Sequence, residues 1–344
     1  MPMDPEKEIT IYDLARELNI SVATISRALK DDPVVSKKTK KKITDLAEQL
    51  GYRSNHFARN LRSQRTHMIG VIIPRVNSYF MSTVIAGIEK VTSEAGYNLI
   101  ISQSSESVDR EKEAVKTMFN NRVDGLLVSL AYDTTDATHF DIFDRKRIPF
   151  LFFDRVIDDN RWTSILIDNH KAGYEATAHL IAQGCRRIVH LTAASTQKVY
   201  RDRLAGYRQA LEEHDIPFRK EYVIQNNLTP EAGVEAAGRI LAMKPRPDGV
   251  FVANDNSAVH CLLTLKQAGV RIPEDVAFVG FNNDPVSMVV EPNLSTINYP
   301  GYEMGVIAAR NLIQHLGGLS SIEATNTILL RSELIVRASS LKHR

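Results

Sequence analysis

Residues 20 to 30 read ISVATISRALK and combine small, β-branched and hydroxylated side chains with one arginine. On a helix, the short side chains of Val22 and Ala23 would let the backbone approach a DNA groove closely and contact thymine methyl groups. Arg27 lies on the same side of such a helix and can donate two hydrogen bonds to O6 and N7 of guanine. This spacing therefore predicts a helix that contacts bases in the major groove.

Hydroxyl and ammonium groups near this segment could bind the DNA backbone. Ser21 and Thr24 can bond phosphates. Lysines follow in the first turns of the next expected helix, at positions 37, 38, 40, 41 and 42. Cations at a helix N-terminus oppose the helix dipole, so a bound anion would explain them, and a solvated charged surface is the alternative.

Three short helices are expected to position these side chains. Thr10, Ser21 and Ser36 are common N-cap residues, and apolar residues on one helical face follow each of them. Asp31-Asp32-Pro33 ends the second helix, and Gly51 is a natural end for the third. Two helices joined by a tight turn and closed by a third form a helix-turn-helix, whose second helix lies in the major groove.

The charge of the chain is unevenly distributed. Residues 1–66 hold 13 Lys or Arg against 9 Asp or Glu, whereas the rest of the 344-residue chain holds 30 against 32. A basic segment on a slightly acidic body is common in proteins that bind nucleic acids. Two cysteines, no secretory signal and no apolar run near the ~18 residues of a membrane span suggest a cytoplasmic protein away from membranes.

Catalytic signatures are missing from the sequence. It contains no GxGxxG after a strand, no GxxxxGK[ST], no HExxH and no GxSxG. Its ten histidines show no metal-ligand spacing. We therefore expect no enzyme activity, no cofactor and no metal site.

From residue 67 the chain alternates apolar, strand-like runs with helical patterns. The runs occupy 69–74, 97–102, 124–130, 149–155, 164–168, 186–193, 248–255 and 276–284. Near-continuous apolar runs are typical of parallel strands covered on both faces, and helical stretches such as 80–96 suit the crossovers. The pattern occurs twice, which predicts two Rossmann-like α/β lobes side by side.

Polar side chains follow several of these strands. They are Asn77, Ser78, Ser129, Asp154, Arg155, Asn254, Asp255, Asn282 and Asn283. Ligands of open α/β sheets bind at the carboxyl ends of the strands, so these groups would surround a cleft between the lobes. Amide, carboxylate and guanidinium groups suit a polyhydroxylated or carboxylated small molecule. Simple capping of the next helix is the alternative for each one.

The segment ITIYDLARELNISVATISRALKDDPVVSKKTKKKITDLAEQLGYRSNHFARNLRSQRTHMIGVIIP resembles the head of LacI/GalR-family bacterial transcriptional regulators, and the similarity continues through nearly the whole chain. The resemblance implies that Val22, Ala23 and Arg27 contact bases. It also implies contacts to DNA phosphates, for which the candidates are Ser21, Thr24, Ser26 and Lys37.

NHFARNL, residues 55–61, is similar to the hinge helix of the family. The helix is too short to be stable alone in water, and in the family it becomes ordered on operator DNA when paired with its dimer mate. Leu61 would then be an apolar wedge in the minor groove, with Ala58 and Arg59 beside it. A plain linker is the alternative.

The resemblance also assigns an effector site between the lobes. VYRDRLAGY, residues 199–207, places Arg203 as the main effector-binding side chain, and NSYF provides Phe80 as a stacking wall. FFDR contributes Asp154, and VAND contributes Asn254 and Asp255. In GFNND, Asn282 occupies the position of a usual family aspartate, and an amide there loses a charge-assisted hydrogen bond.

Three segments are expected: a helix-turn-helix domain over 1–54, a hinge helix and linker over 55–66, and an effector and dimerisation domain over 67–344. Within the last, we expect one lobe at about 67–163 and 292–324 and the other at about 164–291 and 325–344. The resemblance implies a homodimeric repressor of double-stranded operator DNA, controlled by a sugar or sugar derivative. A solute-binding protein and a regulator that uses a protein corepressor are the alternatives.

Overall fold

The computed structural model describes residues 9–52, 65–158, 161–193, 197–324 and 327–342. The chain divides into two compact units, residues 1–66 and 67–344, each of which is described by itself. We call them the head and the effector unit. No helix among these described residues is long and apolar enough to cross a membrane.

Over its described residues, the head contains three helices: α1 (Ile11–Leu18), α2 (Val22–Ala28) and α3 (Lys37–Gln49). They begin after Thr10, Ser21 and Ser36, as the sequence predicts. Thr10 forms a reciprocal capping box with Asp13, and the hydroxyls of Ser21 and Ser36 accept hydrogen bonds from backbone N–H groups of the first turns. The apolar side of each helix is buried in a small common core, which consists of Leu14, Ile25, Ala28, Val35, Ile43 and Ala47.

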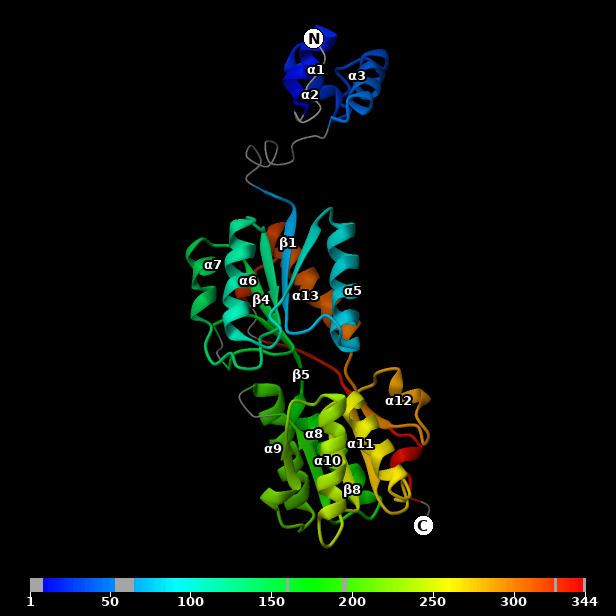
Figure 1. Cartoon of the computed structure of the whole chain (residues 1–344). Helices are drawn as coiled ribbons and strands as arrows, with labels where there is room; N and C mark the ends of the chain where they lie inside the picture. Colours follow the sequence, from blue (N-terminus) through cyan, green and yellow to red (C-terminus); the bar gives the residue numbers. More distant parts are fainter. Residues whose placement is uncertain (1–8, 53–64, 159–160, 194–196, 325–326, 343–344) are drawn as a thin grey trace. The chain divides into compact units, whose positions relative to one another are not determined.

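The first lobe of the effector unit is built on a wholly parallel six-stranded sheet with the order β11-β5-β4-β3-β1-β2. Its strands are β1 (Met68–Ile73), β2 (Asn98–Gln103), β3 (Gly125–Val128), β4 (Phe150–Phe153), β5 (Ser164–Ile167) and β11 (Thr327–Leu330). Helices cover both faces, as Figure 1 shows: α5 (Tyr79–Glu94), α6 (Val108–Asn120), α7 (Asp141–Arg145) and α13 (Gly301–Leu316).

The second lobe repeats this design, with the strand order β12-β10-β9-β8-β6-β7 and only β12 antiparallel to its neighbour. Its strands are β6 (Ile188–Thr192), β7 (Val223–Gln225), β8 (Gly249–Val252), β9 (Ala277–Asn282), β10 (Ser295–Asn298) and β12 (Glu333–Ile335). Its helices are α8 (Asn169–Ala182), α9 (Lys198–Glu213), α10 (Pro230–Ala242), α11 (Asp255–Gln267) and α12 (Val286–Val289). The two-lobed α/β fold is therefore confirmed.

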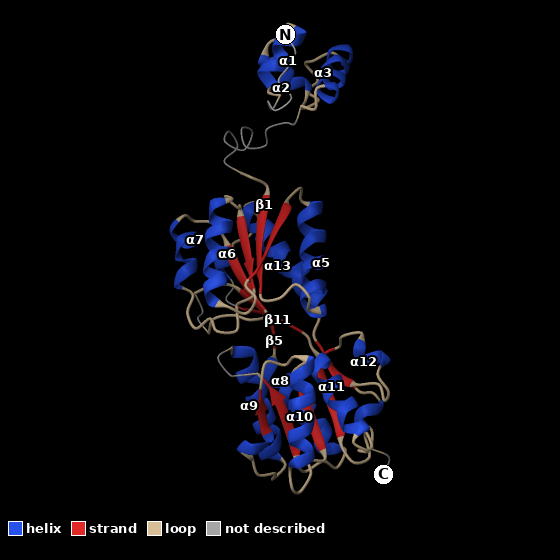
Figure 2. Ribbon diagram, viewed as in Figure 1, coloured by secondary structure: helices blue, strands red, loops and turns tan. Residues whose placement is uncertain are grey.

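The expected lobe boundaries are wrong at three strands. β5 and β11, assigned to the second lobe, pair in the first sheet, and β10, assigned to the first lobe, pairs with β9 in the second. Figure 2 shows β5 and β11 where the chain passes between the lobes. Which sheet a strand joins depends on its pairing partner, and the apolar pattern of the strand itself does not reveal that partner.

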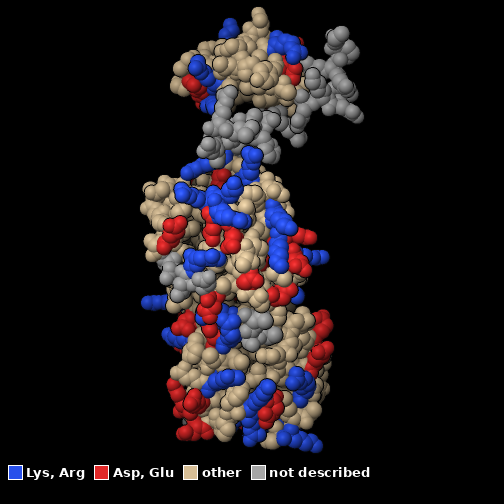
Figure 3. Space-filling model, turned by 90° about the vertical axis from the view of Figure 1, so that its left-hand side faces the viewer, with Lys and Arg blue, Asp and Glu red and all other residues tan. Residues whose placement is uncertain are grey.

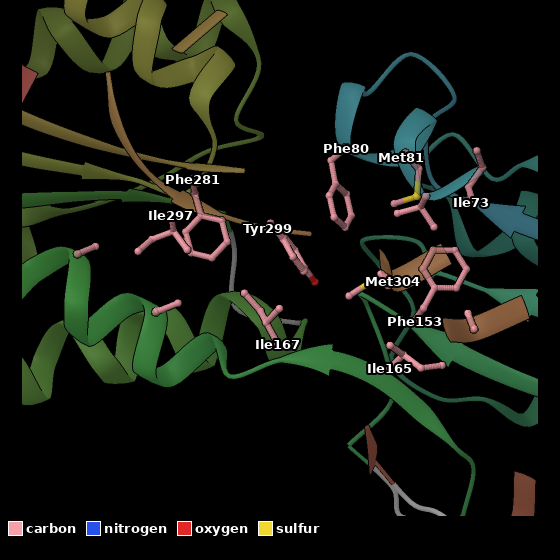
Figure 4. Packing of buried hydrophobic residues seen from close by; sticks show 14 of the residues in the cluster. Ile73, Phe80, Met81, Phe153, Ile165, Ile167, Phe281, Ile297, Tyr299 and Met304 are labelled. Atoms are coloured by element: carbon pink, nitrogen blue, oxygen red, sulfur yellow. The ribbon is translucent and has the colours of Figure 1, made fainter. Parts of the chain in front are cut away.

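A single apolar cluster continues from one lobe into the other. Figure 4 shows Met81 and Phe153 on the first-lobe side, Phe281 on the second-lobe side, and Tyr299 between them. The rings of Phe80 and Tyr299 stack with centroids 4.2 Å apart. On the surface, by contrast, charged side chains of both signs are interspersed over the face of the effector unit seen in Figure 3.

Candidate functional sites

The recognition helix predicted from the sequence corresponds to α2. Its inner side is fixed by Ile25 and Ala28, which are buried in the head core. Ala23 and Arg27 are exposed, and Val22 is half-buried at the edge of the same surface. The structure thus brings the three predicted base-contacting side chains to the outer side of one short helix.

The predicted phosphate-contacting side chains lie around the starts of α2 and α3. The Ser21 hydroxyl caps α2 and is 2.8 Å from the Thr24 hydroxyl. Ser26 is half-buried, and Lys37 is exposed directly after the N-cap of α3. Ser21 is already engaged locally, yet its exposed hydroxyl keeps a lone pair or proton for a further partner.

Lys40 has a role that sequence reasoning did not identify. Its Nζ lies 2.6 Å from a carboxylate oxygen of Asp31 and donates to the Asp31 carbonyl at 2.8 Å. Asp31 has a left-handed backbone conformation with φ 56° just after α2. Lys40 therefore bridges the start of α3 to the turn that follows α2.

The hinge prediction concerns Ala58, Arg59 and Leu61, which lie outside the described residues.

The effector unit contains a cavity of about 580 Å³ between its lobes. It lies at the carboxyl ends of strands from both sheets, where the sequence predicts a ligand site. Among its walls are five of the six predicted effector residues, namely Phe80, Asp154, Arg203, Asn254 and Asn282.

Arg203 is a buried cation in this wall. Its Nε donates to Asn169 Oδ1 at 2.9 Å, its Nη1 donates to the Ala253 carbonyl at 3.0 Å, and its guanidinium carbon lies 3.5 Å from the ring centroid of Phe281. Burial lowers the pKa of Arg203. These hydrogen-bond and ring partners are neutral, and no ion pair of Arg203 is formed within the described residues, so the guanidinium can still attract a polar or anionic group that enters the cavity.

Asp154 faces Arg203 from the first lobe. Its carboxylate accepts hydrogen bonds from Ser129 Oγ at 3.2 Å and from the Tyr299 hydroxyl at 2.9 Å. Burial raises the pKa of Asp154. The aromatic pair of Phe80 and Tyr299 lies beside these polar groups, and such a combination of ring faces and hydrogen-bonding groups suits a sugar ring.

Glu106 and Arg155 also line the cavity. Arg155 was expected beside the cleft but was not assigned to effector binding, and Glu106 was not predicted. Two hydrogen bonds of 2.6 and 3.3 Å join the Arg155 guanidinium to the Glu106 carboxylate. Although burial opposes the charged form of Arg155, Tyr200 and Glu106 raise its pKa overall. The FFDR motif could have indicated Arg155, because this residue directly follows Asp154. No local sequence pattern indicated Glu106 or Tyr200.

Asn254 and Asp255 differ in role despite being adjacent. Asn254 lines the cavity and caps α11, with its Oδ1 accepting the Ser257 N–H at 2.8 Å. Asp255 is fully buried beneath the wall, where it accepts hydrogen bonds from the Thr296 hydroxyl at 2.7 Å and the Asp284 N–H at 2.8 Å. The prediction that Asp255 contacts the effector is therefore wrong, because both of its oxygens hold the chain around β9 and β10.

Several wall residues have backbone conformations that non-glycine residues rarely adopt. Glu106, Asp154, Leu228 and Asn282 have φ values of 65°, 57°, 54° and 112°, respectively. Such conformations are costly and concentrate at ligand sites. Their presence on both sides of the cavity supports a binding role for it.

Comparison with known proteins agrees with both units. Residues 10–55 match the model of bacterial regulatory proteins of the lacI family, and residues 177–340 match a periplasmic binding protein-like domain. The chain is 31% identical to catabolite control protein A of Priestia megaterium over 309 residues, covering 90% of this chain and 92% of that one.

Two solved structures are similar over almost the whole chain. One is a Lac repressor dimer bound to operator and the anti-inducer ONPF, with a TM-score of 0.86 and 25% identity, covering 97% of this chain and 100% of the other. The second is a complex of the transcriptional regulator CelR with cellobiose, with a TM-score of 0.73 and 26% identity, covering 96% and 100%.

Proposed function

Since this chain belongs to the lacI family of bacterial transcriptional regulators, we propose that it is a cytoplasmic repressor whose operator affinity is controlled by a sugar or sugar derivative in the interlobe cavity. The chain is a DNA-binding regulator with an effector-binding domain. The proposal of a sugar-like effector rests on the cavity of about 580 Å³, which combines a buried Arg203, further polar groups and stacked aromatic rings.

DNA recognition is assigned to α2. Val22, Ala23 and Arg27 contact base edges, while Ser21, Thr24, Ser26 and Lys37 contact phosphates. Each head contacts one half of a near-palindromic operator. Phosphate contacts supply much of the affinity, so binding weakens steeply with salt. In the hinge, Leu61 enters the minor groove, with Ala58 and Arg59 beside it.

The functional state is a homodimer. Exposed apolar side chains support this: Tyr79 and Ile101 on the first lobe, and Met288 and Val289 on α12, have 45 to 80% of their surface accessible. Ile101 lies on β2, an edge strand of its sheet. A second copy would remove these side chains from water.

Effector binding changes the angle between the lobes and thereby the spacing of the two heads in the dimer. Release of DNA by the effector is the expected direction, and corepression is the alternative. Because linkage is reciprocal, operator binding weakens effector binding by the same factor, corresponding to ~1–3 kcal/mol or more.

The test uses the full-length protein and a defined panel: D-glucose, cellobiose, D-glucuronate and D-glucose 6-phosphate. Each compound is screened by thermal shift and then for release of an operator duplex selected from a randomised pool. At least one compound should raise the melting temperature and change operator affinity.

Arg203→Ala should abolish both responses while operator binding without effector persists. As a matched control, Arg208→Ala removes an arginine of the same helix that does not line this cavity. A normal response in Arg203→Ala would place the effector elsewhere.

A further inference from the structure

Asp284 is an acidic residue of the cavity wall that was not among the effector-binding residues predicted from the sequence. It is also not at the position of the usual family aspartate, which Asn282 occupies. It follows β9, lines the cavity and is only 9% exposed. In GFNND it lies two residues after the position where the family usually has an aspartate.

The carboxylate of Asp284 accepts few hydrogen bonds within the described residues. Its Oδ2 receives a single long contact of 3.5 Å from Asn282 Nδ2. Its Oδ1 is buried without a hydrogen-bond partner among the residues that the structure describes. Burial raises the pKa of Asp284 to about 6. An ionised carboxylate of this kind is costly to bury unless another group donates hydrogen bonds to it.

The neighbouring buried acids do not share this feature. Each oxygen of Asp154 accepts one hydrogen bond from a hydroxyl, and each oxygen of Asp255 accepts one from Thr296 or a backbone N–H. The backbone of Asp284 is also fixed, because its N–H donates to Asp255 at 2.8 Å and its carbonyl accepts from Ser287 Oγ at 2.6 Å. The side chain is therefore held in the cavity wall, with one carboxylate oxygen unpaired among the described residues.

We propose that Asp284 binds the effector directly, its carboxylate accepting a hydrogen bond from an effector hydroxyl group. The inference rests on the proposed function and narrows the effector class. The end of the effector at Asp284 carries hydroxyl groups, because a carboxylate or phosphate there would meet a like charge. Any acidic group of the effector lies instead at Arg203.

The first experiment compares the full-length wild type with Asp284→Ala and Asp284→Asn, using the panel compound that gives the largest thermal shift. Asp284→Ala should weaken binding of that compound by at least ~10-fold, which is typical for loss of a charge-assisted hydrogen bond. Asp284→Asn should lose less, because an amide oxygen still accepts. Asp109→Ala, an exposed acid on α6, is the control and should bind normally. Equal affinity of the wild type and Asp284→Ala would overturn the proposal.

A second measurement needs no effector. The dimer is treated at pH 6 with a water-soluble carbodiimide and glycinamide, and labelled carboxyls are located by mass spectrometry. Asp284 should be labelled, whereas Asp154 and Asp255 should not. Labelling of Asp109 without Asp284 would show that the carboxyl is not presented to the cavity and would overturn the proposal. A panel in which no compound binds would count against the proposed function, while the labelling would still decide the role of Asp284.

Discussion

Two arginines show how burial changes what the same side chain can do. Arg27 is exposed on α2, so its five N–H donors are free to hydrogen-bond base edges. Arg203 is 3% exposed and is held by Asn169, the Ala253 carbonyl and the ring of Phe281. The first arginine can adapt to a DNA sequence, whereas the second presents a fixed charge to one small cavity.

Arg27→Ala should reduce discrimination between the selected operator and a scrambled duplex by about 1–3 kcal/mol, because a bidentate contact to guanine is lost. Weak, salt-dependent binding to both duplexes should remain. Arg16→Ala on α1, whose side chain is 77% exposed, provides the matched control. Fluorescence anisotropy with both duplexes measures the effect, and an unchanged preference would remove Arg27 from the base-contacting set.

From the burial of His190 we predict how the stability of the second lobe depends on pH. It is fully buried in β6, stacked on Phe251 and Tyr207, and its Nδ1 bonds the Phe251 carbonyl at 3.1 Å. Burial lowers its pKa to about 3. The unfolded chain takes up this proton near pH ~6.5 and the folded chain does not, so the free energy of unfolding falls as the pH decreases between these values, by at most ~1.4 kcal/mol per unit.

His190→Phe keeps the ring stack but cannot titrate. It should lose some stability at pH 7.5, because the hydrogen bond is removed, and should lose less additional stability than the wild type on going to pH 5. Urea unfolding at both pH values measures the difference. Asp255 and Asp284, whose raised pKa values act in the opposite direction, are common to both proteins. Equal losses would exclude His190 as the source.

At the scale of elements, the close approach of α8 and α9 positions the effector arginine. A Cβ on Gly206 would lie 2.0 Å from the His170 carbonyl oxygen, and one on Gly173 would lie 2.3 Å from the Arg203 carbonyl oxygen. Only glycine fits at these two crossings. The resulting proximity allows Asn169 of α8 to hold Arg203 of α9.

Gly206→Ala should therefore destabilise the effector unit by about 1–3 kcal/mol or more, since the helices must move apart. It should also weaken the response to the effector. Gly238→Ala on α10 is the control, because a Cβ there meets nothing within 4 Å. That change should stabilise the protein by ~0.5–1 kcal/mol through helix propensity. Differential scanning calorimetry distinguishes the two, and similar melting temperatures would contradict the packing argument.

Helices and strands with clear caps or apolar runs could be predicted from the sequence. The pairing of strands that are distant in the sequence could not. Caps such as Ser21 and the eight apolar runs identified the helices of the head and most strands. β7, β10, β11 and β12 were missed, because each has only three or four residues and forms no distinct apolar run in the sequence. Asp255 and Asp284 show the same limit in the site: both acids follow a strand, and only the fold decides which one is covered and which one faces the cavity.

On the scale of the whole effector unit, the start of α9 connects the lobes. Gln197, only 2% exposed, directs its Nε2 at the carbonyls of Ala131 and Thr134 in the first lobe, at 2.9 and 3.0 Å. The same loop is held from within its own lobe by Glu111, which accepts from the Ala131 N–H at 2.6 Å and the Thr134 hydroxyl at 2.9 Å. A buried path of hydrogen bonds thus runs from α6 to the helix that carries Arg203.

Gln197→Ala should loosen this arrangement by about 1–3 kcal/mol, because buried carbonyls lose their donor. The amides of residues 131–134 should exchange hydrogen faster, and the radius of gyration from small-angle scattering should increase as the lobes separate. Effector affinity should fall, since Arg203 and the first lobe are no longer held together. The control is Gln209→Ala, which removes an amide that donates to Glu213 on the surface of the same helix and should change none of these quantities. Hydrogen exchange and scattering of Gln197→Ala like those of the wild type would contradict this argument. The three chain segments that connect the lobes, after β5, β10 and β11, would then fix the angle between them without a contribution from Gln197.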